Sequence, residues 1–114
     1  MEFLNKVEIK GIVGMSDTQK YAHTSMTKFS VVTEYSYKSA DGTDTIETTW
    51  WCCTKVYGKG EPLLLKRGDK VHVIGRLRIN RYADDSGLVP IERTLNEVVV
   101  QRVEILDRAT EDSK

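Results

Sequence analysis

Apolar and polar residues alternate along five segments of this chain. The segments run from Asn5 to Gly14, Lys28 to Tyr37, Ile46 to Tyr57, Lys70 to Tyr82 and about Thr94 to Leu106. Because successive side chains of an extended strand point to opposite faces, this alternation predicts half-buried β-strands. The only candidate helix, Glu61 to Lys66, has room for barely two turns and fits a loop as well. The pattern predicts an all-β protein.

The segments between the strands contain residues typical of tight turns. Asp41-Gly42 predicts a hairpin between the second and third strands, and Asp84-Asp85-Ser86-Gly87 predicts another after the fourth. Gly11 is a position where the first strand could bend or bulge. Residues 14–27 have no apolar periodicity, so we expect them to form a polar connector.

Five short strands with one interruption, between the third and the fourth, match the five-stranded Greek-key barrel of the oligonucleotide/oligosaccharide-binding (OB) fold. Another small barrel or a sandwich is the alternative. The chain has 114 residues, enough for one domain with a substantial core. We expect this domain to span residues 1–106 and a short polar tail to span residues 107–114.

The fourth strand combines an apolar face with a basic one. Alternation places Arg76 and Arg78 on the face opposite to the positions expected to enter the core, which are Val71, Val73, Leu77 and Ile79. Tyr82 follows at the mouth of the hairpin. Cations bind the phosphates of a single-stranded nucleic acid and aromatic rings stack on its bases. This strand is therefore a candidate nucleic-acid surface.

The net charge does not by itself attract a polyanion. The chain has 17 basic and 17 acidic residues, so its formal net charge is zero. The charges are unevenly distributed, however, because residues 66–81 contain six basic residues and one acidic residue, whereas residues 104–114 contain four acidic and two basic residues. Such segregation can produce a basic face on a neutral protein.

Other classes of function find little support in the sequence. No apolar run approaches the roughly 20 residues of a membrane helix and no secretory leader follows Met1, so we expect a cytoplasmic protein. The neighbours Cys52 and Cys53 favour two reduced thiols, one in the core and one partly exposed. His23 and His72 lack ligand-spaced partners, and no nucleophile or phosphate-binding motif occurs. We expect no enzyme activity, metal or cofactor.

Four motifs occur in a specific order along the chain. They are Leu4-Asn5-Lys6-Val7-Glu8-Ile9-Lys10-Gly11, Thr49-Trp50-Trp51 leading to Val56-Tyr57-Gly58-Lys59, Lys66-Arg67-Gly68-Asp69-Lys70-Val71 with Gly75-Arg76-Leu77-Arg78, and Arg81-Tyr82 with Asp85-Ser86-Gly87. From about Leu4 to Leu106 the chain thereby resembles the DNA-binding domain of bacterial single-stranded DNA-binding proteins.

The resemblance implies that a few aromatic residues stack on bases over a basic surface. By position these aromatics are Tyr37, Trp51, Tyr57 and Tyr82. Alternation independently places Trp51, Cys53, Lys55 and Tyr57 on one face of a strand. The expected DNA-binding residues are Tyr37, Trp51, Lys55, Tyr57, Lys59, Arg76, Arg78, Arg81 and Tyr82. Core packing is the alternative role for these aromatics.

The chain departs from this family in three places. The segment between the third and fourth strands is shorter than the family's usual helix. Trp50 stands where the family commonly has an acidic or polar residue, and packing within the fold is the favoured role for it, with its orientation left open. The sequence ends at Glu111-Asp112-Ser113-Lys114 without the family's flexible linker and acidic tip. We therefore do not expect protein partners that depend on such a tip.

Together these features predict sequence-independent binding of single-stranded DNA during replication, recombination or repair. The resemblance further implies a homotetramer or homodimer built partly through the first strand. One alternative is a primosomal-type replication accessory protein, which binds single strands while helping to load other proteins. Another is an interaction module that keeps the fold and binds a protein through the aromatic face.

Overall fold

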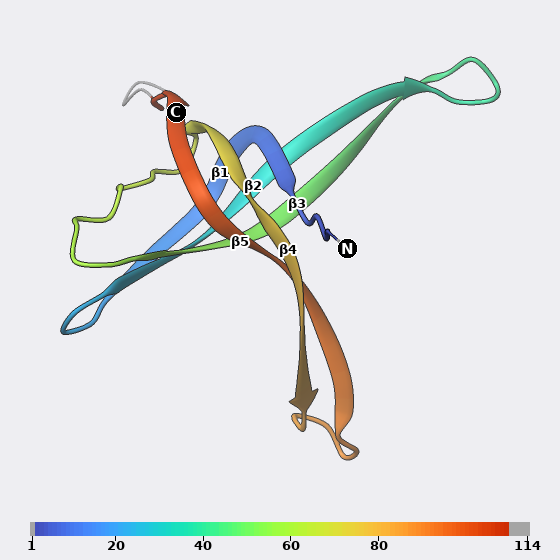
Figure 1. Ribbon diagram of the computed structural model, residues 1–114. Helices are drawn as coiled ribbons and strands as arrows, with labels where there is room; N and C mark the ends of the chain where they lie inside the picture. The colour runs from blue at the N-terminus through green and yellow to red at the C-terminus, as the bar shows by residue number, and fades with distance from the viewer. Residues whose placement is uncertain (1, 110–114) are drawn as a thin grey trace.

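Five long strands close into a barrel in the computed structural model, which describes residues 2–109 (Figure 1). They are β1 (Val7–Lys20), β2 (Ser25–Lys38), β3 (Asp44–Tyr57), β4 (Lys70–Asp84) and β5 (Ile91–Asp107). The order around the barrel is β1-β2-β3-β5-β4, and β4 pairs with β1 to close it. The β3–β5 pair is parallel and the other four pairs are antiparallel. The prediction of an all-β, five-stranded barrel is confirmed.

Inward-facing side chains from all five strands fill the barrel. The buried apolar residues are Ile9, Val13, Phe29, Val31, Cys53, Leu65, Val71, Val73, Val98 and Val100. Most are β-branched residues, which favour strands. Full burial of each such side chain stabilises the fold by about 1.5–3 kcal/mol. Leu65 comes from the loop between β3 and β4 and covers one end of the core.

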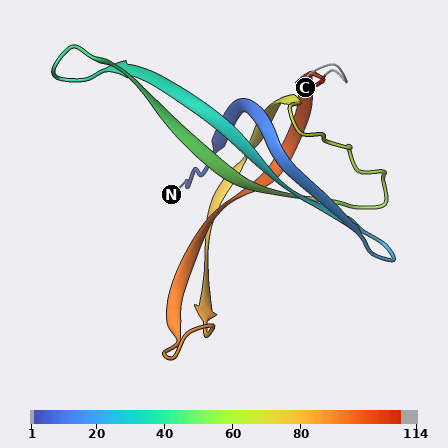
Figure 2. The same cartoon turned by 180° about the vertical axis from the view of Figure 1, so that it is seen from behind.

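Two hairpins extend well beyond the barrel (Figures 1 and 2). We define the β2–β3 arm as residues 33–49. In this arm β2 and β3 pair with each other as far as Lys38 and Asp44. The arm leaves the barrel because β3 pairs with β5 only at residues 52–54. In the β4–β5 arm, defined as residues 79–96, pairing continues to Asp84 and Ile91. Both predicted hairpins are therefore present, and Gly42 adopts the positive φ of 85° that its turn requires.

The expectation that Leu77 and Ile79 enter the core is wrong. Val71 and Val73 are buried as predicted, but Leu77 is 36% and Ile79 is 58% exposed. Leu77 still pairs with the buried Val98, so it has the expected orientation. Beyond this point β4 and β5 form a two-stranded ribbon, and no other layer of the described structure covers its apolar side.

The connections also differ from the sequence-based expectations. Residues 14–27 are not a polar connector, because β1 continues to Lys20 and β2 begins at Ser25. Their polar residues form the ends of two strands, where pairing does not need an apolar face. The irregularity in β1 lies between Val13 and Ser16 rather than at Gly11. Residues 61–66 form a loop without helix, which is one of the two forms expected.

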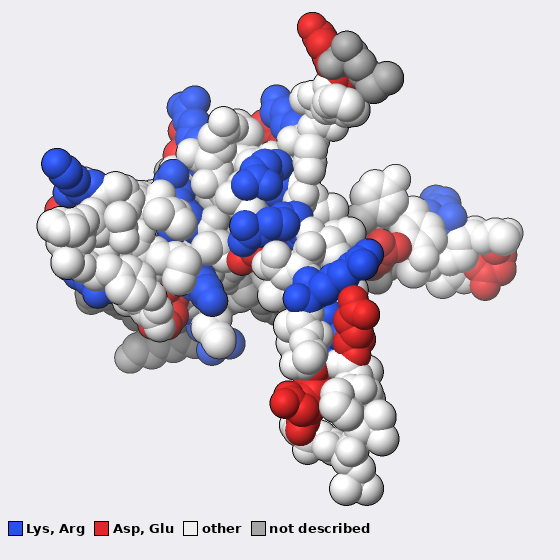
Figure 3. Space-filling view, turned by 60° about the horizontal axis from the view of Figure 1, so that its bottom comes forward, with Lys and Arg blue, Asp and Glu red and all other residues white. Residues whose placement is uncertain are grey.

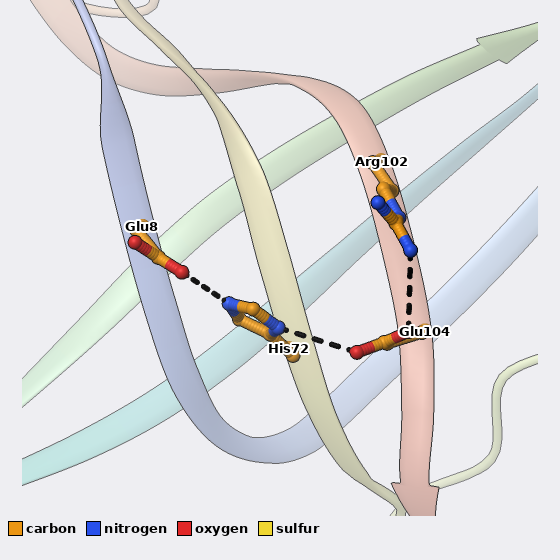
Figure 4. Close-up of polar contacts among 4 residues, drawn as sticks. All are labelled: Glu8, His72, Arg102 and Glu104. Atoms are coloured by element: carbon orange, nitrogen blue, oxygen red, sulfur yellow. Dashed lines mark hydrogen bonds and ion pairs between the residues drawn. The ribbon is translucent and has the colours of Figure 1, made fainter.

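Polar contacts on the barrel surface link strands that are distant in sequence. His72 of β4 lies between two carboxylates, with Nε2 2.6 Å from Glu8 of β1 and Nδ1 3.4 Å from Glu104 of β5 (Figure 4). Arg102 lies 3.7 Å from Glu104 and extends this row. The hydrogen bond with His72 lowers the pKa of Glu8. This row lies at the β1–β4 seam, where the barrel closes.

The fully buried Asp69 anchors the end of β5 to the β3–β4 loop. Its carboxylate accepts hydrogen bonds from the amides of Lys66 and Ala109 and contacts Arg108 at 3.3 Å. Burial alone would raise the pKa of Asp69, but these amides and the charge of Arg108 outweigh it and lower the pKa. The described part of the predicted tail is thus held against the barrel, and residues 110–114 lie outside the described residues.

Candidate nucleic-acid interface

The β2–β3 arm presents a row of aromatic residues on one face. Register pairs Trp51 with Val31, and Tyr35 and Tyr37 with Glu47 and Thr45, so all three aromatics lie on the side that continues the barrel interior. The rings of Tyr35 and Tyr37 stack with centroids 6.1 Å apart and an interplanar angle of 30°. Tyr35 is absent from the predicted site, although its alternation with Tyr37 would have indicated it.

Trp51 stands at the base of this arm and is held by the fold. Its half-buried ring packs against the core cluster, and Nε1 donates a hydrogen bond of 2.9 Å to Oγ1 of Thr33. The packing against the core and the hydrogen bond to Thr33 together set the orientation of the indole ring. Its solvent-accessible part can therefore receive a base without first losing side-chain freedom.

Lys55, Tyr57 and Lys59 lie farther along β3 and in the loop that follows. Lys55 Nζ is 5.0 Å from the centroid of the Tyr57 ring, a distance typical of a cation–π contact. The amine also donates to the carbonyl of Gln101 in β5 at 3.1 Å. Burial raises the pKa of the Tyr57 hydroxyl. The buried Cys53 separates this pair from Trp51 along the strand.

The loop after β3 lies beside the turn between β1 and β2 (Figure 2). Between them is an open cavity of about 220 Å³, to which Lys20, His23 and Lys59 contribute. Lys20 is 3.8 Å from Glu61, whereas Lys59 forms no ion pair with another described residue. Lys59 is thus a cation without an ion-pair partner among the described residues, two positions after Tyr57.

The three predicted arginines lie in different environments. Arg76 is exposed and forms no ion pair within residues 2–109. Arg81 lies 4.0 Å from Glu92. Because both side chains are exposed, this ion pair contributes little to stability. Arg78 lies only 2.6 Å from Glu97. Tyr82, the predicted aromatic of the β4–β5 arm, is also exposed.

Glu97 is the centre of a polar cluster that sequence reasoning missed. It is only 7% exposed and accepts hydrogen bonds from Arg78 at 2.6 Å, from Asn80 at 2.8 Å and from the hydroxyl of Thr54. Burial alone would raise the pKa of Glu97, but these three donors outweigh it and lower the pKa. The carboxylate is therefore charged at neutral pH and offsets the charge of Arg78.

Basic side chains gather on the body of the protein. On the face seen in Figure 3, Lys and Arg lie mainly on the barrel where the arms leave it, and acidic residues lie mainly along the arms. The neutral chain thus has a segregated charge distribution. The predicted residues occupy three regions: the β2–β3 arm and its base with Tyr37 and Trp51, the end of β3 and the following loop with Lys55, Tyr57 and Lys59, and the β4–β5 hairpin with Arg76, Arg78, Arg81 and Tyr82.

The cysteines have the predicted states. Both are free thiols, with Cys53 buried and Cys52 exposed. Burial raises the pKa of Cys53 to about 12, so its thiol stays protonated. Within residues 2–109, no three His, Cys, Asp or Glu side chains are arranged to hold a metal ion. The same residues contain no helix of the length and apolarity that crossing a membrane requires.

Comparison with known proteins identifies related sequences. A sequence model of the Single-strand binding protein family matches residues 4–106. A single-stranded DNA-binding protein of Bacteroides thetaiotaomicron is 30% identical over 109 residues, which cover 90% of this chain and 66% of that protein. Another, from Xanthomonas axonopodis pv. citri, is 30% identical over 110 residues, covering 90% of this chain and 58% of that protein. The chain therefore spans somewhat less than two thirds of the length of these curated relatives.

Solved structures show the same fold. An SSB from Plasmodium falciparum, in complex with ssDNA, superposes with a TM-score of 0.76 at 17% identity, covering 94% of this chain and 98% of that one. A small single-stranded DNA-binding protein from Streptomyces coelicolor gives a TM-score of 0.65 at 16% identity, covering 90% of this chain and 95% of that one. These matches confirm the OB fold that the strand pattern predicts.

Proposed function

Because the chain belongs to the Single-strand binding protein family, we propose that it binds single-stranded DNA without sequence preference, in replication, recombination or repair. The named relatives are themselves single-stranded DNA-binding proteins. A protein in this role works where the DNA is, which in bacteria is the cytoplasm.

The observation that carries the proposal is the row of Tyr35, Tyr37 and Trp51 on one face of the β2–β3 arm and its base. Tyr35 is 68% and Tyr37 is 42% exposed, although aromatic side chains are usually more buried. Stacking contributes about 1–3 kcal/mol per base and tolerates every base. Cations such as Arg76 of β4 and Lys59 of the loop after β3 supply contacts to phosphates, which carry no sequence information.

A titration with oligo(dT) tests this function directly. Stacking on Trp51 should quench tryptophan fluorescence at low salt. High salt should reverse the quenching, because binding releases counterions from the DNA and the affinity therefore falls as the salt concentration rises. A random-sequence oligonucleotide of equal length is the control for base preference. No quenching at micromolar protein would reject the proposal and favour the alternative in which the aromatic face binds a protein.

We further propose that the chain assembles as a homodimer or homotetramer through β1. This strand pairs with β4 only up to Ile12 and with β2 only from Ile12 onward. Each half of β1 thus has one edge without a partner strand among the described residues, and a free edge can pair with a second copy. Light scattering measures the molar mass, and a monomer at micromolar concentration would contradict the proposal.

A further inference from the structure

An apolar groove surrounds Trp50 on the outer face of the barrel. Trp50 pairs with Val32 and projects from the face of β3 opposite to Trp51. It is 60% exposed, and its ring lies over Gly14, where a Cβ atom would come within 2.5 Å of Cζ3. Ile12 and Met15 of β1 also line the groove, whose volume is about 510 Å³. The absence of a side chain at position 14 leaves room for the indole.

Among the described residues, the one charged residue that lines this groove is the positive Arg67, so no carboxylate lines it. Lys70 pairs with Ile12 and lies on the same outer face. Neither Arg67 nor Lys70 forms an ion pair with another residue in the described range 2–109. An aromatic ring with free cations at its edge has the chemistry that a nucleotide requires.

The free edge of β3 connects this groove with the inner aromatic row. Because β3 pairs with β5 only at residues 52–54, its edge along residues 44–51 has no partner strand within the described chain. A flexible single strand that stacks on Trp51 can therefore pass over this edge and reach Trp50 on the other face.

We propose that the groove is a second stacking subsite, in which Trp50 stacks on a base of the same DNA strand and Arg67 and Lys70 contact the adjoining phosphates. The proposal rests on the proposed function and extends the DNA path around β3. A second copy of the chain is the competing occupant. It is disfavoured because a two-fold interface through the groove would bring the two copies of Arg67 together, with no carboxylate among the lining residues to pair with them.

The chain has two tryptophans, so single-tryptophan variants report each face separately. Trp51→Phe leaves only Trp50 as the fluorophore, and Trp50→Phe leaves only Trp51. We expect oligo(dT) to quench both variants at low salt. Quenching of Trp50→Phe without quenching of Trp51→Phe would overturn the subsite while leaving the proposed function intact. No quenching in either variant would overturn both.

Affinity and mass measurements complete the test. Trp50→Ala should weaken binding of long oligo(dT) by about 5- to 30-fold, the lower half of the range for one stacked base. Arg67→Ala should reduce the slope of log affinity against log salt by about 0.7, whereas the control Arg102→Ala, on the outer face of β5, should not. Unchanged affinity with a lower molar mass of Trp50→Ala in light scattering would identify the groove as an interface between copies and overturn the proposal.

Discussion

The ion pair between Arg78 and Glu97 should limit how much this arginine contributes to the proposed DNA binding. Glu97 is nearly buried, whereas the side chain of Arg78 is about half exposed, so the arginine could reach a phosphate if it were released. In Glu97→Gln the amide oxygen can still accept from Arg78 and Asn80. The amide nitrogen faces Thr54, whose hydroxyl can accept instead of donate. The substitution thus removes the charge and keeps the shape.

The expected cost in stability is small. Hydrogen bonds to a charged group contribute about 1.5–3 kcal/mol and those between neutral groups about 0.5–1.5 kcal/mol. The desolvation cost of the carboxylate disappears together with its charge, which offsets part of this difference. We expect Glu97→Gln to lower the free energy of unfolding by about 1 kcal/mol, measured by urea denaturation at pH 7.

The expected effect on binding is a steeper dependence on salt. Each additional phosphate contact on a single strand steepens the slope of log affinity against log salt by about 0.7. The ratio of the affinities at 50 and 200 mM salt should therefore increase about 2.6-fold in Glu97→Gln, as measured by fluorescence titration with oligo(dT).

Two arginine variants serve as controls for this reasoning. Arg76 is unpaired within residues 2–109, so Arg76→Ala should reduce the slope by about 0.7, while Arg78→Ala in the wild-type background should leave it nearly unchanged. An unchanged slope in Glu97→Gln, or equal effects of the two arginine variants, would show that Glu97 does not hold Arg78 away from the DNA.

Three further predictions concern stacking, stability and reactivity. Trp51→Ala should weaken oligo(dT) binding by about 1–3 kcal/mol and also lower the melting temperature, whereas Thr33→Val, which removes only the hydrogen bond, should affect the DNA affinity far less. Asp69→Ala should lower the free energy of unfolding by about 3 kcal/mol at pH 7, because two amides lose their acceptor. The pKa of Asp69 is lowered by folding, so its contribution is complete above the unfolded value of about 4 and lost as pH falls further. Urea denaturation of the wild type and this variant between pH 7 and 2 should show the difference shrinking below pH 4; a constant difference would contradict this. A thiol reagent should modify Cys52 quickly and Cys53 only on unfolding, and rapid reaction of two thiols would argue against the burial of Cys53.

Much of the fold is predictable from local sequence. The alternation of Val7, Ile9 and Val13, or of Val71 and Val73, is a property of the extended backbone and identifies strands and their faces. The turn at Asp41-Gly42 is equally local, because glycine readily adopts a positive φ. Connections are harder to predict: the polar stretch 14–27 has no apolar face, yet its residues extend two strands whose backbone groups pair with each other.

Most aromatic and basic residues of the candidate site were predictable because they lie in strands whose faces alternate, whereas Lys59, in the loop after β3, was predicted only from the family resemblance. Tyr35 was missed although it follows the same alternation as Tyr37. Glu97 could not be found in this way, since it contacts Arg78 only through the register of β4 on β5. That register depends on the length of the connecting loop and on an irregularity at Ile74 and Gly75, neither of which leaves a signal in the alternation.

The sequence by itself determined the central part of each strand, which side of each strand is apolar, and the family to which the chain belongs. Only the tertiary structure decided which apolar sides are covered, so that Val73 is buried and Ile79 is exposed although both follow the same alternation. It also decided that Trp50 faces outward and Trp51 inward, and that Arg78 is neutralised while Arg76 is free. The physical reason is that orientation along a strand is local, whereas burial and charge pairing depend on neighbours brought close by long-range pairing.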